Sequence, residues 1–400
     1  MKSPSNLPNV VVNRKGASRL LAGHPWVYKS DVTKIDADTA PGALVAVNDE
    51  RGRLLGTALY SSSSQITLRL VSSETINDLP AMIRERIRAA VIYRKNLVSG
   101  SNAYRLVFSE ADQIPGLIAD RYNDIISVQI LTQAMDRAEV RQAIVETLRE
   151  QVAEAEHVIE RVDARIRQLE ELPPLGGGLL AGTQTTTTYE MNGLIFQFDG
   201  VAGQKTGAFL DQRENYAAAA SYAHGEALDV CTYQGGFALH LAASKQVSAV
   251  TAVDISRPAL EVAEENLGLN KDRIDKEIEW IEGNAFDLLK DYSSAGKQYD
   301  TIVLDPPAFA KSKRTLDTAM RGYKEMNLRA IKMLRPGGIL VTCSCSFHVS
   351  EPEFLAMLAS AAADAHRAVK ILEKRGAAKD HPTVVTIPET GYLKCMICTA

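Results

Sequence analysis

The chain has 400 residues, of which 46% are hydrophobic and 24% charged, a balance that excludes a disordered or membrane-embedded protein. This length is too great for one ordinary hydrophobic core, so we predict two or three domains. No apolar run reaches the roughly 20 residues that span a bilayer, and the first residues lack the apolar core of a signal peptide. We therefore expect a cytoplasmic protein without a membrane partner. The five cysteines, an odd number, favour reduced thiols over a disulfide framework.

Charge is spread unevenly along the chain. The whole sequence carries a net charge of −4, yet residues 1–72 contain nine Lys and Arg against five Asp and Glu, a balance of +4. A basic segment of this kind indicates a nucleic-acid partner that is held through its phosphates. On charge alone, an ordinary solvated surface explains the excess equally well.

The first seventy residues alternate short apolar stretches with turn residues such as Pro41, Gly42 and Gly52. This spacing is typical of a small β-barrel or sandwich. We predict strands over residues 10–13, 43–49, 54–60 and 66–71.

The next part of the chain mixes helix and strand patterns. Apolar residues recur at helical spacing over residues 79–97, where we predict a helix that links two domains. Strands over 105–108 and 125–132, followed by a helix over 140–152, predict a small α+β domain. The Pro- and Gly-rich stretch 171–178 predicts a loop.

From residue 227 onward, apolar strands alternate with amphipathic helices. Such alternation predicts an α/β fold with parallel strands, whose binding crevice lies at the carboxyl ends of the strands. The predicted strands cover residues 227–230, 249–255, 278–283, 301–307 and 338–344. We expect three domains, over residues 1–72, 73–189 and 190–400.

The first strands of this series carry the residues of a nucleoside site. Asp229 ends one strand, and Gly235 and Gly236 then allow the backbone to turn tightly and approach a ligand. Asp254 ends the next strand, where an acid can accept hydrogen bonds from both ribose hydroxyls. The Gly-x-Gly-x-x-Gly motif that binds a pyrophosphate is absent, which suits S-adenosylmethionine because that cofactor has no phosphate. Asn284, after the third strand, is placed either to face the adenine or to cap a helix.

Asp305 follows the fourth strand and is itself followed by Pro306 and Pro307. The prolines hold the chain extended, so the carboxylate is fixed in the crevice, where it suits the polar edge of a planar base. A rigid structural turn with a solvated aspartate is the alternative.

The fifth strand runs into Cys343 and Cys345, which alternate to the same face if the strand persists. Only the later residue, Cys345, is expected to project past the strand end as a nucleophile. Two buried structural cysteines are the alternative. His348 is a weaker candidate for a base. Cys395 and Cys398 have no second pair at zinc-site spacing and are explained by a final strand, so we expect no metal.

In this order, the motifs resemble the bacterial 23S ribosomal RNA cytosine-5 methyltransferases, which combine a PUA domain, a central α+β domain and a class I methyltransferase domain. The segments RLLAGHPWVY and GTALYSSSSQI resemble the PUA segment, and YRLVFSEADQIPGLIADRYND resembles the middle domain. The segment KTGAFLDQREN resembles the one that leads into the methyltransferase domain, and DPPAF and SCS resemble the catalytic signatures. The resemblance implies RNA, and 23S rRNA in particular, as the partner and S-adenosyl-L-methionine as the cofactor. It implies that four residues line the cofactor pocket: Lys205, Thr206, Gly207 and Gln212.

The motifs and the resemblance predict a covalent mechanism on a cytosine flipped out of its RNA context. Cys345 adds to carbon 6, Asp305 holds the N3/N4 edge of the base, and carbon 5 takes the methyl group. Better-known RNA cytosine-5 enzymes carry a second cysteine where this chain has Ala308, so product release cannot use that thiol. The group that removes the carbon 5 proton stays open.

Two other functions stay open on the sequence. An enzyme of the same fold can methylate a base nitrogen through Asp305 and its prolines without a nucleophile, and a non-enzymatic RNA-binding assembly factor can keep a vestigial cofactor site. The sequence does not determine the oligomeric state, for which a homodimer is one arrangement.

Overall fold

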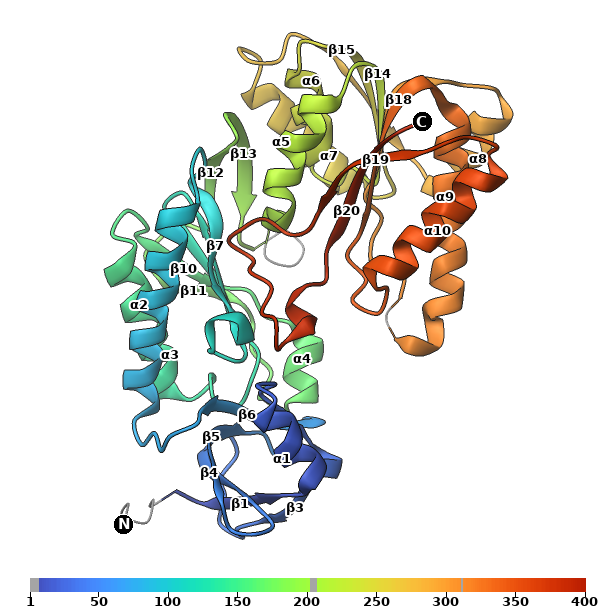
Figure 1. Cartoon of the computed structure of the whole chain (residues 1–400). Coiled ribbons are helices and arrows are strands. Elements are labelled where there is room, and N and C mark those ends of the chain that lie inside the picture. Colours follow the sequence, from blue (N-terminus) through green and yellow to red (C-terminus); the bar gives the residue numbers. More distant parts are fainter. Residues whose placement is uncertain (1–6, 202–206, 311) are drawn as a thin grey trace. The chain divides into compact units, whose positions relative to one another are not determined.

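The computed structural model describes residues 7–201, 207–310 and 312–400. These residues form two compact units (Figure 1). Among their helices, none is long and apolar enough to cross a membrane. The first unit comprises Met1–Tyr189, Phe198–Ala208 and Lys379–Thr390, and the second comprises Glu190–Gln197, Phe209–Ala378 and Gly391–Ala400.

A six-stranded sheet forms the N-terminal part of the first unit, in the order β2-β6-β5-β4-β1-β3. Val10 and Val12 of β1 are buried at alternate positions and pack in one core with Ala17 and Leu20 of α1. The four strands predicted from the sequence are confirmed, whereas α1, β2 and β3 were not predicted. The elements are β1 (Asn9–Val12), α1 (Arg14–Leu21), β2 (Trp26–Tyr28), β3 (Val32–Ile35), β4 (Leu44–Asp49), β5 (Leu54–Tyr60) and β6 (Ile66–Ser72).

A five-stranded sheet in the order β11-β10-β9-β8-β7 forms the second part of this unit, with α2 packed against α3 and β7. Helix α2 begins where the sequence predicts, because Asp78 caps it by accepting a hydrogen bond from the N–H of Ala81. It is more than a link between domains, since Ile83, Ile87 and Val91 are fully buried. The elements are α2 (Leu79–Leu97), β7 (Ala103–Phe108), β8 (Leu117–Tyr122), β9 (Ile125–Ile130), α3 (Ala138–Gln151), β10 (His157–Glu160), α4 (Ala164–Leu169) and β11 (Gly178–Ala181).

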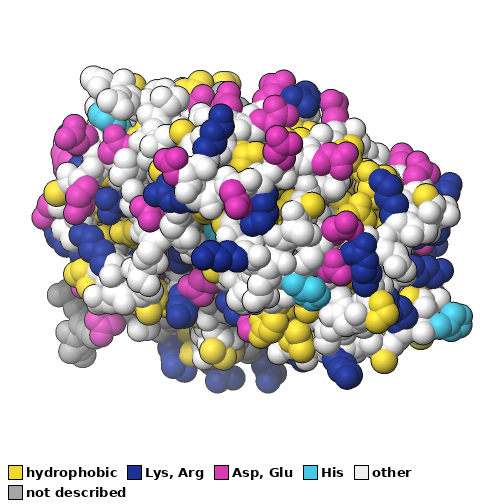
Figure 2. Space-filling model, turned by 90° about the horizontal axis from the view of Figure 1, so that it is seen from above, with side chains coloured by type: hydrophobic (Ala, Val, Ile, Leu, Met, Phe, Trp, Pro, Cys, Tyr) yellow, Lys and Arg dark blue, Asp and Glu magenta, His cyan; other side chains and the backbone are white. Residues whose placement is uncertain are grey.

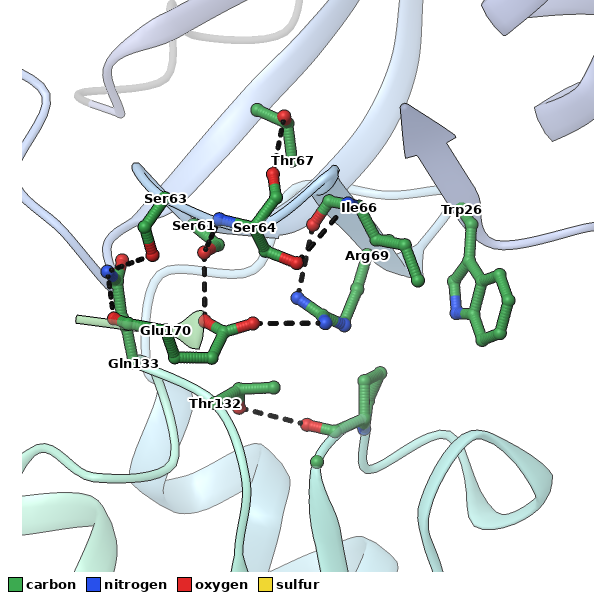
Figure 3. Close-up of polar contacts among 12 residues, drawn as sticks. Trp26, Ser61, Ser63, Ser64, Ile66, Thr67, Arg69, Thr132, Gln133 and Glu170 are labelled. Atoms are coloured by element: carbon green, nitrogen blue, oxygen red, sulfur yellow. Dashed lines mark hydrogen bonds and ion pairs between the residues drawn. The ribbon is translucent and has the colours of Figure 1, made fainter. Parts of the chain in front are cut away.

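Polar side chains join these two parts of the first unit (Figure 3). The buried carboxylate of Glu170 accepts hydrogen bonds from Ser61 Oγ (2.8 Å) and from the guanidinium of Arg69 (3.2 Å). Gln133 Nε2 donates to Ser63 Oγ (3.2 Å) and to the backbone carbonyl of Glu170 (2.8 Å). A buried charge is costly unless it is paired and hydrogen-bonded in this way, so the cluster fixes the two parts against each other.

Residues 379–390 belong to the first unit although they lie near the end of the chain. The buried carboxylate of Asp380 accepts a hydrogen bond from the N–H of Arg105 (2.8 Å), and its backbone carbonyl accepts one from Arg94 Nε (3.1 Å). The ring of His381 lies 5.5 Å from that of Phe108. A protein cut near residue 190 would therefore separate this segment from its buried partners.

The second unit is built on a seven-stranded sheet in the order β16-β15-β14-β17-β18-β20-β19. Strands β14 to β18 run parallel, and β20 runs antiparallel to both its neighbours. Helices α5, α6 and α7 lie on one side of the sheet and α8, α9 and α10 on the other (Figure 1). The five strands predicted here and the final strand are confirmed, as is the α/β fold class. The strands are β14 (Gly225–Val230), β15 (Val247–Asp254), β16 (Ile278–Glu282), β17 (Tyr299–Leu304), β18 (Leu334–Ser344), β19 (Lys370–Arg375) and β20 (Lys394–Thr399).

The helices of this unit are α5 (Arg213–Tyr222), α6 (Gly236–Ala243), α7 (Arg257–Leu269), α8 (Ala285–Ser294), α9 (Leu316–Met333) and α10 (Glu351–Asp364). Helix α10 begins with a capping box, in which Ser350 and Glu353 exchange side-chain and backbone hydrogen bonds. Strands β12 (Thr186–Met191) and β13 (Leu194–Asp199) form a separate two-stranded sheet.

Acidic and basic side chains are interspersed over most of the face drawn in Figure 2, with hydrophobic side chains between them. This mixture agrees with a net charge near zero for the whole chain. A surface that binds a polyanion such as RNA must therefore be a local cluster of Lys and Arg side chains.

Candidate active site

Four polar residues singled out in the sequence lie at one edge of the seven-stranded sheet. Asp229 is the second-last residue of β14 and Asp254 is the last residue of β15, while Asp305 and Cys345 directly follow β17 and β18. Strand β14 pairs in parallel with β15 and β17, and β17 pairs with β18. The carboxyl ends of these strands therefore meet at the same edge, where α/β folds bind their ligands.

Asp229 is completely buried. Its Oδ2 accepts hydrogen bonds from Thr232 Oγ1 (2.5 Å) and from the N–H of Ala238 (2.9 Å), whereas its Oδ1 has no partner within the described ranges. Burial is the main cause that raises the pKa of this carboxyl to about 7. A buried oxygen without a partner fits the cationic amino group of a ligand, so Asp229 suits the amino-acid end of S-adenosylmethionine.

The turn after β14 needs glycine at two positions for different reasons. Gly235 has a φ of 83°, in the left-handed region that side chains disfavour. A Cβ on Gly236 would lie 2.5 Å from the ring of Tyr216. The N–H of Tyr233, in the same turn, donates to Asp254 Oδ2 (2.9 Å), which fastens the turn to the end of β15.

Asp254 and Asn284 follow neighbouring strands but differ in their contacts. The two carboxylate oxygens of Asp254 accept backbone hydrogen bonds from Tyr233 and Ser256, each at 2.9 Å. These bonds orient the carboxylate and leave a second lone pair on each oxygen for ribose hydroxyls. Asn284 is exposed and caps α8, with its Oδ1 accepting from the N–H of Phe286 (2.9 Å). The helix cap is thus present, and a contact of Asn284 with adenine stays a prediction.

Asp305 is held by a chain of buried amides. Gln212, only 2% exposed, donates from Nε2 to Asp305 Oδ2 (3.0 Å), and its Oε1 accepts from Asn215 Nδ2 (2.6 Å). Arg375 Nε in turn donates to Asn215 Oδ1 (2.9 Å). The structure thus places Gln212 as the residue that orients Asp305, while its expected contact with the cofactor stays a prediction.

The two neighbouring cysteines differ in burial. Cys343 lies inside β18, is completely buried and stands opposite Cys395 of β20. Burial first, and then Cys395, raises the pKa of Cys343 well above its ordinary value, so this residue stays a thiol. Cys345 follows the end of the strand and is only half-buried. Of the two, Cys345 is therefore the one that a substrate can reach.

The backbone on both sides of Cys345 is anchored to a buried tyrosine. Ser344 Oγ donates to the phenolic oxygen of Tyr323 (3.0 Å), and the hydroxyls of Tyr323 and Ser346 lie 2.9 Å apart. The N–H of Ala310 donates to Ser346 Oγ (3.2 Å), which ties the loop after β17 to the loop after β18. These bonds hold the aspartate-bearing and cysteine-bearing loops side by side.

Several sequence candidates lie elsewhere. Lys205 and Thr206 fall outside the described residues. Gly207 belongs to the first unit, where a Cβ would lie 2.6 Å from the ring of Phe198, and its role at the cofactor stays a prediction. The ring of His348 lies beside that of Phe347, at 5.3 Å. Within the described ranges, no group of three His, Cys, Asp or Glu is placed to hold a metal ion.

Sequence reasoning missed three residues of this site: Asn215, Tyr323 and Lys394. They come from α5, α9 and β20. Asn215 ends the segment KTGAFLDQREN, but the resemblance gave it no role, and no motif places Tyr323 or Lys394 beside Asp305 or Cys345. For Lys394 the available signal was a charged residue that begins an otherwise apolar strand.

Residues 10–73 match a family described as PUA-like domain, and residues 110–394 match one described as S-adenosylmethionine-dependent methyltransferase. Curated relatives named Ribosomal RNA large subunit methyltransferase I come from Vibrio parahaemolyticus (36% identity, 94% of this chain, 95% of the relative) and Photobacterium profundum (37% identity, 94% and 95%). A solved SAM-dependent methyltransferase from Streptococcus mutans has the same fold, with 18% identity, a TM-score of 0.82 and coverage of 98% of this chain and 100% of that one.

The strand order of the second unit, with its antiparallel β20 and its acids at the strand ends, defines the class I methyltransferase fold. The chain belongs to the S-adenosylmethionine-dependent methyltransferase family, and it carries a PUA-like domain at its N-terminal end. It is therefore an enzyme whose cofactor is S-adenosylmethionine, and a purely RNA-binding role does not describe it.

Proposed function

We propose that this enzyme methylates carbon 5 of a cytosine in large-subunit (23S) ribosomal RNA, with Cys345 as the nucleophile and Asp305 as the residue that holds the base. The observation that carries the proposal is the placement of Cys345 directly after β18, beside the strand end that bears Asp305. The relatives named Ribosomal RNA large subunit methyltransferase I support the choice of RNA.

The chemistry needs a nucleophile because carbon 5 of cytosine is too electron-poor to attack a methyl donor unaided. The thiolate of Cys345 adds to carbon 6, and the electron pair of the former double bond makes carbon 5 nucleophilic. Carbon 5 then takes the methyl group, and the bond between that group and the cofactor sulfur breaks. Loss of the carbon 5 proton to a base and departure of the thiolate restore the ring. Asp305, oriented by Gln212, suits the N3/N4 edge throughout.

We place S-adenosylmethionine at the same strand ends. Asp229 suits its amino group, the turn that begins after β14 passes beside it, and Asp254 suits the ribose. Its other proposed contacts follow from the sequence alone: Asn284, Asp305, Lys205, Thr206, Gly207 and Gln212.

We further propose a division of labour along the chain. Residues 1–72 bind structured RNA through phosphates and shape, residues 73–189 help to position it, and residues 190–400 carry out methyl transfer. An enzyme of bacterial ribosomal RNA works in the cytoplasm, where we place this chain. A homodimer is an arrangement that this division neither requires nor excludes.

The test compares two cysteine variants with the wild type. RNA that contains 5-fluorocytidine should trap the wild-type enzyme covalently, because fluorine replaces the proton that must leave. Cys345→Ala should form no adduct and transfer no label from methyl-labelled cofactor to rRNA, yet keep its cofactor affinity, since the lost interaction exists only along the reaction path. Cys343→Ala should keep both activities and lose about 1 kcal/mol of stability for a small buried side chain.

Two results would contradict the proposal in different ways. A Cys345→Ala enzyme that still transfers label would end the covalent mechanism and favour methylation of a base nitrogen. A folded but inactive Cys343→Ala enzyme, with thermal melting as the control, would mean that the other thiol is the nucleophile.

A further inference from the structure

Lys394 is a lysine in an uncommon position, because it is only 6% exposed. Its ammonium donates hydrogen bonds to the backbone carbonyls of Ser346 (2.6 Å) and Tyr392 (2.7 Å). Both acceptors are neutral groups. A buried ammonium is costly to desolvate, and two carbonyls compensate only part of that cost. The sheet therefore keeps a positive charge in a place where packing alone would favour an apolar side chain.

The antiparallel course of β20 sets this charge beside the proposed nucleophile. Lys394 is the strand partner of Ser344, and its ammonium binds the carbonyl of Ser346. Cys345 lies between these two serines in the chain. The lysine thus spans the short backbone segment that presents the thiol.

The charged and titratable groups around Cys345 come from several elements. Lys394 lies on β20, Tyr323 on α9 and Asp305 after β17, while Glu353 on α10 faces Lys394. Burial lowers the pKa of Lys394 to about 8, and negative charge on Cys345 and on Glu353 opposes this shift. Near pH 7 the ammonium is therefore mostly protonated. Because the attraction between two charges is mutual, a thiolate that helps Lys394 to keep its proton is itself stabilised by Lys394.

We propose that Lys394 is a positioning residue that holds Cys345 as a thiolate in the free enzyme and fixes the carbonyl beside it. This inference rests on the proposed role of Cys345 as the nucleophile. The thiol proton leaves to solvent, and Lys394 keeps its own protons. Its charge offsets the carboxylate of Asp305, which on its own would disfavour an anion at the same sheet edge.

Three substitutions separate the charge from the hydrogen bonds. Lys394→Arg keeps a charge and donors, Lys394→Gln keeps donors without charge, and Lys394→Met keeps neither but retains an unbranched chain of similar bulk. Thermal melting identifies the variants that fold. The matched control is Cys345→Ala, which removes the thiol whose reactivity is measured.

The first measurement is the pH profile of alkylation of Cys345 by iodoacetamide, without RNA or cofactor, located by fragment mass spectrometry. In the wild type, the midpoint of the profile should lie below the ordinary thiol value of about 8.5. Lys394→Arg should stay close to the wild type. Lys394→Gln and Lys394→Met should shift the midpoint upward by about one pH unit or more, which lowers alkylation at pH 7 about tenfold.

The second measurement is single-turnover methyl transfer to rRNA over the same pH range. The neutral variants should lose about tenfold in rate at pH 7 and recover toward the wild-type rate at pH 9, a recovery that a merely structural defect would not show. Because the alkylation profile needs no RNA, it tests Lys394 even if Cys345 proves not to be the nucleophile, whereas an active Cys345→Ala enzyme refutes only the proposed function.

Two results would overturn the inference. The first is a wild-type midpoint at or above 8.5, which is decisive even if no neutral variant folds. The second is an unshifted midpoint in a folded Lys394→Gln or Lys394→Met protein. If such a variant also accumulates a covalent RNA adduct, Lys394 would be assigned to removal of the carbon 5 proton instead.

Discussion

Replacing Asp229 by asparagine should stabilise the second unit, and the gain should grow as the pH rises. The folded protein raises the pKa of this carboxyl to about 7, mainly by burial, against about 3.9 in an unfolded chain. Because the folded state binds the proton more tightly, the free energy of unfolding falls as the pH rises from about 4 to about 7. Asparagine has the shape of the protonated acid and carries no charge at any pH, so it escapes this loss.

The size of the effect follows from the shift in pKa. About three pKa units at about 1.4 kcal/mol each give up to about 4 kcal/mol above pH 7, of which about 1.5 kcal/mol is already lost at pH 5. The stability difference between Asp229→Asn and the wild type should therefore grow by roughly 2–3 kcal/mol between pH 5 and pH 8. For a unit of about 200 residues, that corresponds to roughly 5–10 °C in melting temperature.

Thermal melting of both proteins without cofactor, at pH 5 and pH 8, measures this difference. A melting-temperature difference that is the same at both pH values would refute the reasoning, because it would mean that the buried carboxyl does not titrate between them. Calorimetry of cofactor binding at pH 6.5 in two buffers of different ionisation enthalpy gives an independent reading. If the cationic end of the cofactor lies beside Asp229, binding should release a proton from the wild type and none from Asp229→Asn.

Three further predictions test other parts of the molecule. Asp254→Ala should weaken S-adenosylmethionine binding by about 1.5–3 kcal/mol, or about 10- to 150-fold, with RNA binding unchanged, and unchanged cofactor affinity in a folded variant would remove Asp254 from the site. Glu170→Ala removes the buried carboxylate that Ser61 and Arg69 share and should lower stability by about 3 kcal/mol, although Arg69 keeps its hydrogen bond to the carbonyl of Ile66. Glu150→Ala, which breaks an exposed ion pair, should cost less than about 1 kcal/mol; equal losses in denaturant unfolding would contradict the role of burial. Replacing the exposed Arg51 and Arg53 by Glu should weaken rRNA binding. The slope of log binding constant against log salt concentration should become less steep by about one for each phosphate that the protein no longer binds. Cofactor affinity is the control, and an unchanged slope would mean that RNA binds elsewhere on the protein.

The parallel strands of the second unit could be predicted from the sequence because each is an apolar run with an informative residue at its carboxyl end. Asp229, Asp254 and Asp305 all occupy such places. Strand β19 could not be predicted in this way, since Lys370–Arg375 is mostly exposed and charged and has no apolar period. It is a strand because its backbone pairs with β20, a tertiary interaction that local composition does not carry.

The difference between a local sequence pattern and a tertiary contact also explains which site residues were missed. A motif predicts that Asp305 and Cys345 are presented at strand ends, but it does not say which side chains hold them. Gln212 reaches Asp305 across 93 positions of the sequence, and Tyr323 reaches the serines around Cys345 from a helix on one side of the sheet. Only the packing of the helices on the sheet creates these contacts, so they could not be predicted from the spacing of residues.

The direction of β20 is the feature of the site that the sequence pattern determines least. A parallel final strand would bring its last residues to the edge where the catalytic side chains lie. Because β20 runs antiparallel to β18, its first residue, Lys394, reaches that edge, and its last residues lie at the opposite one. Residues 379–390 precede this strand and belong to the first unit, so the chain must return from that unit to start β20 at Lys394. The charge beside Cys345 therefore depends on the direction of one strand, which an alternating apolar pattern leaves undetermined.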